Sequence, residues 1–191
     1  DEKDEIAPAM KNMVETIGGL DIEVQKLIQA AKDGKLDIRG QAEGYAGTWQ
    51  ELIAGVNGLI DAFVGPINVT AEYVERISSG NIPPKITDTY LGDFNTIKNN
   101  LNSCIDVMNG LIAETSKLTT AIQEGRLDQR GNSGEFNGSW GELLTGVNSL
   151  IDAFVAPINI MAEYMERIGK GEIPPVITDT YYGDFNEIKN S

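Results

Sequence analysis

Hydrophobic residues alternate at four- and three-residue intervals along several long stretches of the chain. An α-helix repeats every 3.6 residues, so this spacing places them on one narrow stripe along a helix. A stripe with a 3.5-residue period is buried when partner helices supercoil around it. The pattern over 93–124 therefore predicts a coiled-coil helix of about 30 residues. Its stripe consists of Ile97, Leu101, Cys104, Met108, Leu111, Thr115, Leu118 and Ile122.

The same stripe, called the apolar seam below, predicts helices of two kinds. The first kind covers about 5–33 and 93–124, and the second kind covers about 49–79 and 140–170. Pro66 and Pro157 fall inside the second kind. A proline there removes a backbone hydrogen bond and clashes with the preceding turn, so we expect a kink. Because the seam continues on both sides, the pattern favours one helix over two domains.

The chain repeats itself. The stretch from Trp49 to Asn100 recurs as Trp140 to Ser191, a shift of 91 positions, and most of the aligned residues are identical. The same shift relates the residues after Gly34 to those after Gly125. A repeat on this scale predicts a tandem array of like structural units, in which each helix and each connector has a counterpart.

Two kinds of connector alternate between the helices. The first-type connectors, 35–48 and 126–139, are rich in glycine, and the second-type connectors, 81–93 and 172–184, carry paired prolines that favour an extended chain. Both lengths reach roughly 40 Å when extended at about 3.3 Å per residue, which permits the next helix to run parallel without requiring it.

Several connector residues have predicted roles. Gly80 and Gly171 follow second-kind helices, where a left-handed glycine would end them, and Asp93 and Asp184 stand where a helix begins, as N-cap or first-turn acids. Apolar residues in these polar loops are expected to insert between helices. These are Ile82, Ile86, Ile173 and Ile177 in the second type, and Leu36, Leu127, Tyr45 and Phe136 in the first.

Charge and composition narrow the function. The net charge of −14 makes nucleic acid and anionic membrane surfaces poor partners. The chain has no histidine and one cysteine, which excludes histidine-based acid–base catalysis, Cys–His nucleophiles and the usual zinc sites. Cys104 lies on a seam and is interpreted as a small buried hydrophobe. We expect no catalytic, cofactor or metal site.

Membrane insertion is not expected, because no run of about 18 apolar residues stands out. The chain begins at Asp1 and ends inside its own repeat pattern, which we interpret as a fragment whose parent could carry a membrane anchor or an output domain. Thr70 and Thr115 lie in apolar seams. Simple tolerance is the preferred interpretation of them, and a hydroxyl bonded to a backbone carbonyl is the alternative.

This order of seam helix, glycine, apolar residue, extended loop, Gly–Asp and second seam helix resembles the HAMP domain of bacterial and archaeal receptors and sensor kinases. The resemblance implies an all-α fold of parallel homodimeric four-helix coiled-coil units, concatenated into an elongated rod. The proline at which the family's first helix begins matches Pro66 and Pro157, and the family's glycine matches Gly80 and Gly171. Its two hydrophobic anchors match Ile82 and Ile86 in the first copy and Ile173 and Ile177 in the second. Its acidic residue at the start of the second helix matches Asp93 and Asp184.

Four units are expected on this basis, at 5–64, 66–108, 109–155 and, truncated, 157–191. The first and third are divergent, because they lack the entry proline and have no clear second anchor after Leu36 and Leu127. The resemblance implies a cytoplasmic, non-enzymatic relay between upstream sensory and downstream signalling domains, most similar to arrays in methyl-accepting chemotaxis proteins or sensor histidine kinases. A static coiled-coil spacer remains the alternative.

Overall fold

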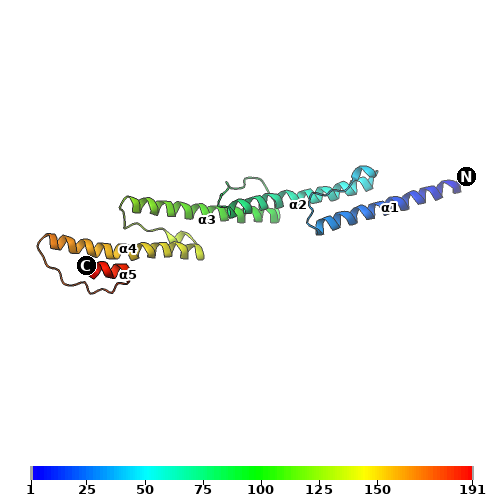
Figure 1. The fold of residues 1–191 in the computed structure, drawn as a ribbon. Helices are drawn as coiled ribbons and strands as arrows, with labels where there is room; N and C mark the ends of the chain where they lie inside the picture. The colour runs from blue at the N-terminus through cyan, green and yellow to red at the C-terminus, as the bar shows by residue number, and fades with distance from the viewer. Residues whose placement is uncertain (1, 191) are drawn as a thin grey trace. The chain divides into compact units, whose positions relative to one another are not determined.

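The structure is a computed structural model that describes residues 2–190, and these residues form α-helices and two short 3-10 turns without any β-strand. The predicted helix bounds are confirmed closely. The elements are α1 (Glu2–Lys32), η1 (Ala42–Gly44), α2 (Thr48–Ser78), α3 (Gly92–Gln123), η2 (Ser133–Glu135), α4 (Ser139–Gly169) and α5 (Gly183–Asn190) (Figure 1). The chain divides within α3 into two compact halves, 1–102 and 103–191, and each is described by itself.

Left-handed glycines end the long helices, as predicted. Gly80 has φ 79° and Gly171 has φ 81°. The Gly80 amide donates to the Ile77 carbonyl at 3.0 Å and the Asn81 amide to the Arg76 carbonyl at 2.9 Å. These two bonds satisfy carbonyls that the helix end would leave unpaired, and only glycine adopts the required φ without strain. Each connector therefore leaves its helix in a defined direction.

The helices of the second kind continue through their prolines, so each is one element. Pro66 lies inside α2 and Pro157 inside α4. The kink itself stays a prediction. One turn beyond Pro66, the Thr70 hydroxyl donates to the Pro66 carbonyl at 2.8 Å, the alternative raised for this seam threonine. Thr115 is exposed, so the seam does not bury it within one chain. Asp93 and Asp184 lie in the first turns of α3 and α5.

Consecutive helices within each half run parallel (Figure 1). In the first half, Tyr45 before α2 lies against Gly19 of α1, and the last turns of α1 face the middle of α2, where Leu27 and Phe63 line one cavity. In the second half, Phe136 lies against Gly110 of α3. Phe136 packs against a cluster of Leu118, Leu144 and Ile151, which come from α3 and α4, and so lies between helices as predicted. Tyr45 is half-buried against α1.

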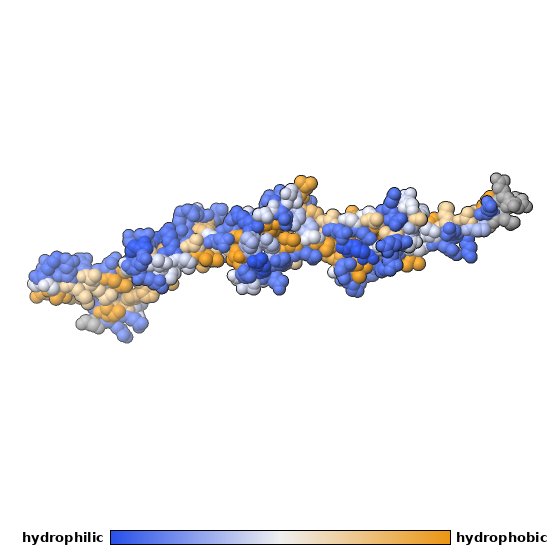
Figure 2. Space-filling view, turned by 90° about the horizontal axis from the view of Figure 1, so that it is seen from above, coloured by the Kyte–Doolittle hydropathy of each residue, from blue (hydrophilic) through white to orange (hydrophobic). Residues whose placement is uncertain are grey.

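One chain covers only part of each apolar seam. Ile53, Leu118 and Leu144 are almost fully buried, whereas Met10, Phe63 and other seam residues stay exposed. In α3 the buried Ile105 and Ala121 lie beside the predicted seam, and Ile97 and Ile122 on it are exposed. In the view of Figure 2, exposed apolar residues lie among hydrophilic ones.

Two helices, α2 and α4, are long and apolar enough to cross a membrane when judged by length and composition alone. The expectation that no segment has this character was therefore wrong as to composition. Their apolar residues repeat at the 3.5-residue spacing of a seam and leave a polar side, which contiguous hydrophobicity counts do not register.

Candidate functional site

The first-type connector is held by a side-chain clamp at Gly40. Asn57 of α2 accepts a hydrogen bond from the Gly40 amide at 2.8 Å and donates one to the Gly40 carbonyl at 2.9 Å. A connector that crosses between helices has no ladder to pair its backbone groups, and an unpaired buried amide is costly. The amide side chain of Asn57 satisfies both groups of one residue. The repeat has the same clamp, in which Asn148 holds Gly131 at 2.8 and 2.9 Å.

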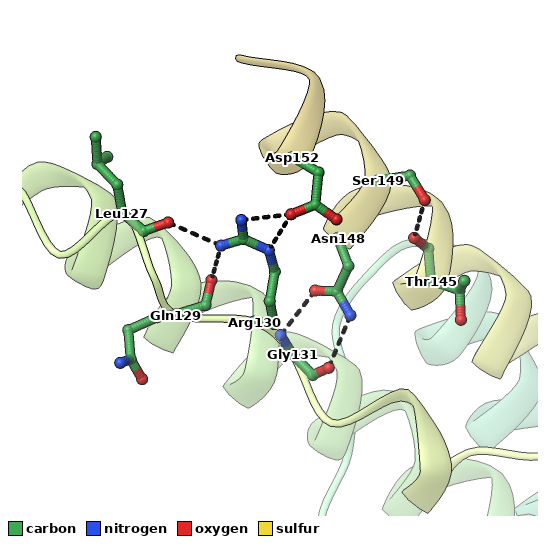
Figure 3. Close-up of polar contacts among 8 residues, drawn as sticks. All are labelled: Leu127, Gln129, Arg130, Gly131, Thr145, Asn148, Ser149 and Asp152. Atoms are coloured by element: carbon green, nitrogen blue, oxygen red, sulfur yellow. Dashed lines mark hydrogen bonds and ion pairs between the residues drawn. The ribbon is translucent and has the colours of Figure 1, made fainter. Parts of the chain in front are cut away.

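An arginine within this connector forms further bonds that hold it in place. Arg39 donates through Nε to Asp61 at 2.9 Å, and its Nη1 donates to the carbonyls of Leu36 and Ile38 at 2.8 Å each. Figure 3 shows the repeat of this arrangement in the second half, where Arg130 joins Asp152 of α4 to the Leu127 and Gln129 carbonyls. Exposed ion pairs stabilise proteins little, but this guanidinium also donates hydrogen bonds to two connector carbonyls and so holds the connector backbone in a turn.

A glutamate on the preceding helix holds the next connector residue. The Glu23 carboxylate of α1 accepts a hydrogen bond from the Gln41 amide at 2.9 Å, and Glu114 of α3 accepts one from the Asn132 amide at 3.0 Å. These two side chains are 14% and 16% exposed, which is low for glutamates. The hydrogen bond from the backbone amide, aided by Lys26, lowers the pKa of Glu23 although burial opposes it. Asn132 and Lys117 lower the pKa of Glu114 in the same way.

The second-type connector uses the same asparagine clamp around an apolar anchor. Asn102 of α3 accepts from the Ile86 amide at 2.8 Å and donates to the Ile86 carbonyl at 3.0 Å. The Ile86 side chain is 6% exposed, and Pro83, three positions earlier, is fully buried. Further along, Lys98 of α3 donates to the Asp88 carbonyl at 3.1 Å. Ile86 is thus a buried anchor, as predicted.

In the alignment of the two clamps, Gly40 occupies the position in the first-type connector that Ile86 occupies in the second-type connector. Gly34 and Gly80 end their helices, Leu36 and Ile82 follow two positions later, and the clamped residues Gly40 and Ile86 follow four positions after those. Gly40 therefore takes the place of the second anchor, and Gly131 does so in the repeat. Sequence reasoning missed it because glycine carries no apolar side chain, although the asparagine that clamps it was visible.

Leucine and isoleucine side chains fill the space that an anchor would occupy. A Cβ placed on Gly40 would lie 2.8 Å from Ile53 Cγ2 and 3.1 Å from Leu27 Cδ1, and one on Gly131 would meet Leu144 and Leu118 as closely. The glycine is required here by space and not by φ. The connector backbone is thereby wedged between the two helices that it joins.

The remaining predicted anchors differ in burial. Ile82, Leu36 and Leu127 are half-buried, and so is Ile177. Ile173 is 96% exposed, so within this chain it does not insert between helices as predicted. Among the residues described, no group of three or more His, Cys, Asp or Glu is arranged to hold a metal ion.

A family model described as HAMP domain matches residues 44–110 and 135–191. Because the two segments cover more than half of the chain, the protein belongs to the HAMP domain family and carries these domains in tandem. No solved structure matches the chain. HAMP domains are non-catalytic linkers that relay signals in receptors and sensor kinases. Both second-type connectors lie inside the matched segments, whereas most of each first-type connector lies outside them.

We predict that Gly40→Ala destabilises the protein. The added methyl group would collide with Ile53 and Leu27, and overpacking of this kind costs about 1–3 kcal/mol. Chemical denaturation followed by circular dichroism measures the effect. Gly44→Ala is the matched control, because nothing lies within 4 Å of its Cβ position. Equal midpoints for the two variants would show that the space at Gly40 is not limiting.

A second prediction concerns pH. The pKa values of Glu23 and Glu114 are lowered from 4.5 in the folded state. Their contribution to stability is therefore full above pH 4.5 and is lost as the pH falls through the lower folded-state value. The denaturation midpoint of the Glu23→Gln, Glu114→Gln variant should fall less than that of the wild type on acidification below 4.5. Parallel losses in both proteins would contradict the assignment.

Proposed function

We propose that the chain is a relay segment of a chemoreceptor or sensor kinase, built of four HAMP units at 5–64, 66–108, 109–155 and 157–191. The continuity of the helices supports this proposal most directly. α2 runs without interruption from Thr48 to Ser78, so it supplies the second helix of one unit and the first helix of the next. α3 and α4 do the same for the following units.

Shared helices make a mechanical relay possible. A rotation or tilt of α1 acts on α2 through the connector that both helices hold, and α2 carries the change past Pro66 without a flexible joint. The two packings of a unit differ in free energy, and a stimulus selects one by interacting with it better. Upstream sensory and downstream signalling domains of the same protein are the natural partners, and the cytoplasm is the proposed location.

The exposed seams support a parallel homodimer. Burying a large apolar side chain contributes about 1.5–3 kcal/mol, so residues such as Met13 and Phe154, 62% and 54% exposed, favour association strongly. A second copy in register would present the same seam and complete a four-helix coiled coil. Lipid is the less suitable cover for α2, because its Asn57 and Asp61 bind the polar connector beside it.

The proposed dimer predicts a solution mass of twice 20.7 kDa that stays constant on dilution. Light scattering measures this mass. Cys104, the single thiol, should form a disulfide between two copies that run parallel and in register, and Cys104→Ser removes the cross-link. A concentration-independent mass of 20.7 kDa would refute the dimer, and a dimer without cross-link would refute the parallel register.

The alternative is a static spacer, and the tight connector clamps would suit it. Ile86→Val in the intact receptor separates the two functions, because removing one buried methylene costs about 0.5–1.5 kcal/mol. If Ile86 anchors one of two signalling packings, its weakening shifts the stimulus midpoint by about 2- to 10-fold, away from the anchored state. The control is Ile22→Val, at a 70% exposed position off the seam. A spacer would show an unchanged midpoint for both variants.

A further inference from the structure

The units that contain a first-type connector are called first-type units here, and the other units are called second-type units. In the first-type units, two consecutive backbone amides are bonded to opposite helices. The Gly40 amide is held by Asn57 of α2 at 2.8 Å, and the Gln41 amide is held by Glu23 of α1 at 2.9 Å. Asn57 also donates to the Gly40 carbonyl at 2.9 Å, and this carbonyl and the Gln41 amide belong to one planar peptide unit, so these two groups keep a fixed separation. Glu23 and Asn57 are consequently fixed relative to each other through a single peptide unit.

The bridge is rigid in the remaining directions as well. Gly40 is wedged between Leu27 of α1 and Ile53 of α2, with no room for another atom. A sliding or rotation of α1 against α2 would have to break the carboxylate bond, the asparagine clamp or this packing. The second half repeats all three features, with Glu114 of α3 and Asn148 of α4 on either side of Gly131 and Asn132.

The second-type units lack the acceptor for such a bridge. Glu23 stands eleven positions before the helix-ending Gly34, and Glu114 stands eleven before Gly125. The positions eleven before Gly80 and Gly171 are Val69 and Ile160, whose side chains accept no hydrogen bond. The side chains that hold Ile86 and Asp88, Asn102 and Lys98, both belong to α3, the following helix.

We propose that the glutamate–connector–asparagine bridge is a register lock that makes the first-type units rigid couplers, so that helix displacement occurs within the second-type units. The lock is a property of the fold, whereas its use in signalling rests on the proposed relay function. The array would then alternate passive units, in which two helices move together, with switching units, in which the first helix moves against an anchored second helix.

Amide hydrogen exchange of the whole chain tests the lock itself. Glu23→Val places the second-type residue in the first unit, and the Gln41 amide should then exchange about tenfold faster, with Gly40 affected as well. Val69→Glu is the reciprocal change, and it should slow exchange of Thr87, seven positions after Gly80 as Gln41 is after Gly34. Glu43→Gln, in the same connector as Gln41, is the control. Exchange of the α2 backbone shows whether each variant stays folded.

An unchanged exchange rate of the Gln41 amide in Glu23→Val would overturn the lock. A uniform rise of exchange rates across α1 and α2 in that variant would also overturn it if Val69→Glu gave no protection of the Thr87 amide. The same variants in the intact receptor test whether the lock is used in signalling. Glu23→Val should weaken transmission by loosening a coupler, and Val69→Glu should block it by locking a switch. Altered exchange with unaltered output would uphold the lock and refute the relay.

Discussion

The fold depends on how an extended backbone is satisfied where it crosses between two parallel helices. Parallel neighbours require a long connector, and its amides and carbonyls have no helix or sheet to pair them. In the described structure an asparagine from the following helix takes both backbone groups of one connector residue, at Gly40, Ile86 and Gly131. At these three residues the contact fixes the connector against the following helix. It acts together with the burial of Ile86 and the close packing at Gly40.

Periodicity predicted the helices well because each seam extends over many turns and its phase is unambiguous. The parallel direction did not follow from the sequence, because connector length permits it without requiring it. The second anchor of the first-type units was missed, since an anchor was expected to be a large apolar side chain and Gly40 is held through its backbone. The repeated asparagines, seventeen positions after Gly40 and Gly131 and sixteen after Ile86, were the available signal.

The seam pattern also predicted which side of each helix makes contacts. It did not show which of those residues contact helices of the same chain and which are left for a second chain. Within α3, Leu118 lies on the seam and is buried, and Ile105, which lies next to the seam, is buried as well. Ile122 lies on the seam and is 41% exposed. A helix in a four-helix bundle contacts two neighbours on adjacent faces, so one stripe serves both. The flanking residues then pack against the helix of the same chain. In the proposed dimer, a second copy would cover the exposed part of the seam.

The two connector types solve one problem with different consequences. An isoleucine anchor such as Ile86 is held by hydrophobic burial, which is non-directional and tolerates small displacements of the helices around it. A wedged glycine with bonds to both helices, as at Gly40, is directional on every side. In the proposed relay, the directional contacts at Gly40 would make its units stiffer than those anchored by isoleucine. The proposed alternation of stiff and soft units would then give the two-part repeat a physical rationale.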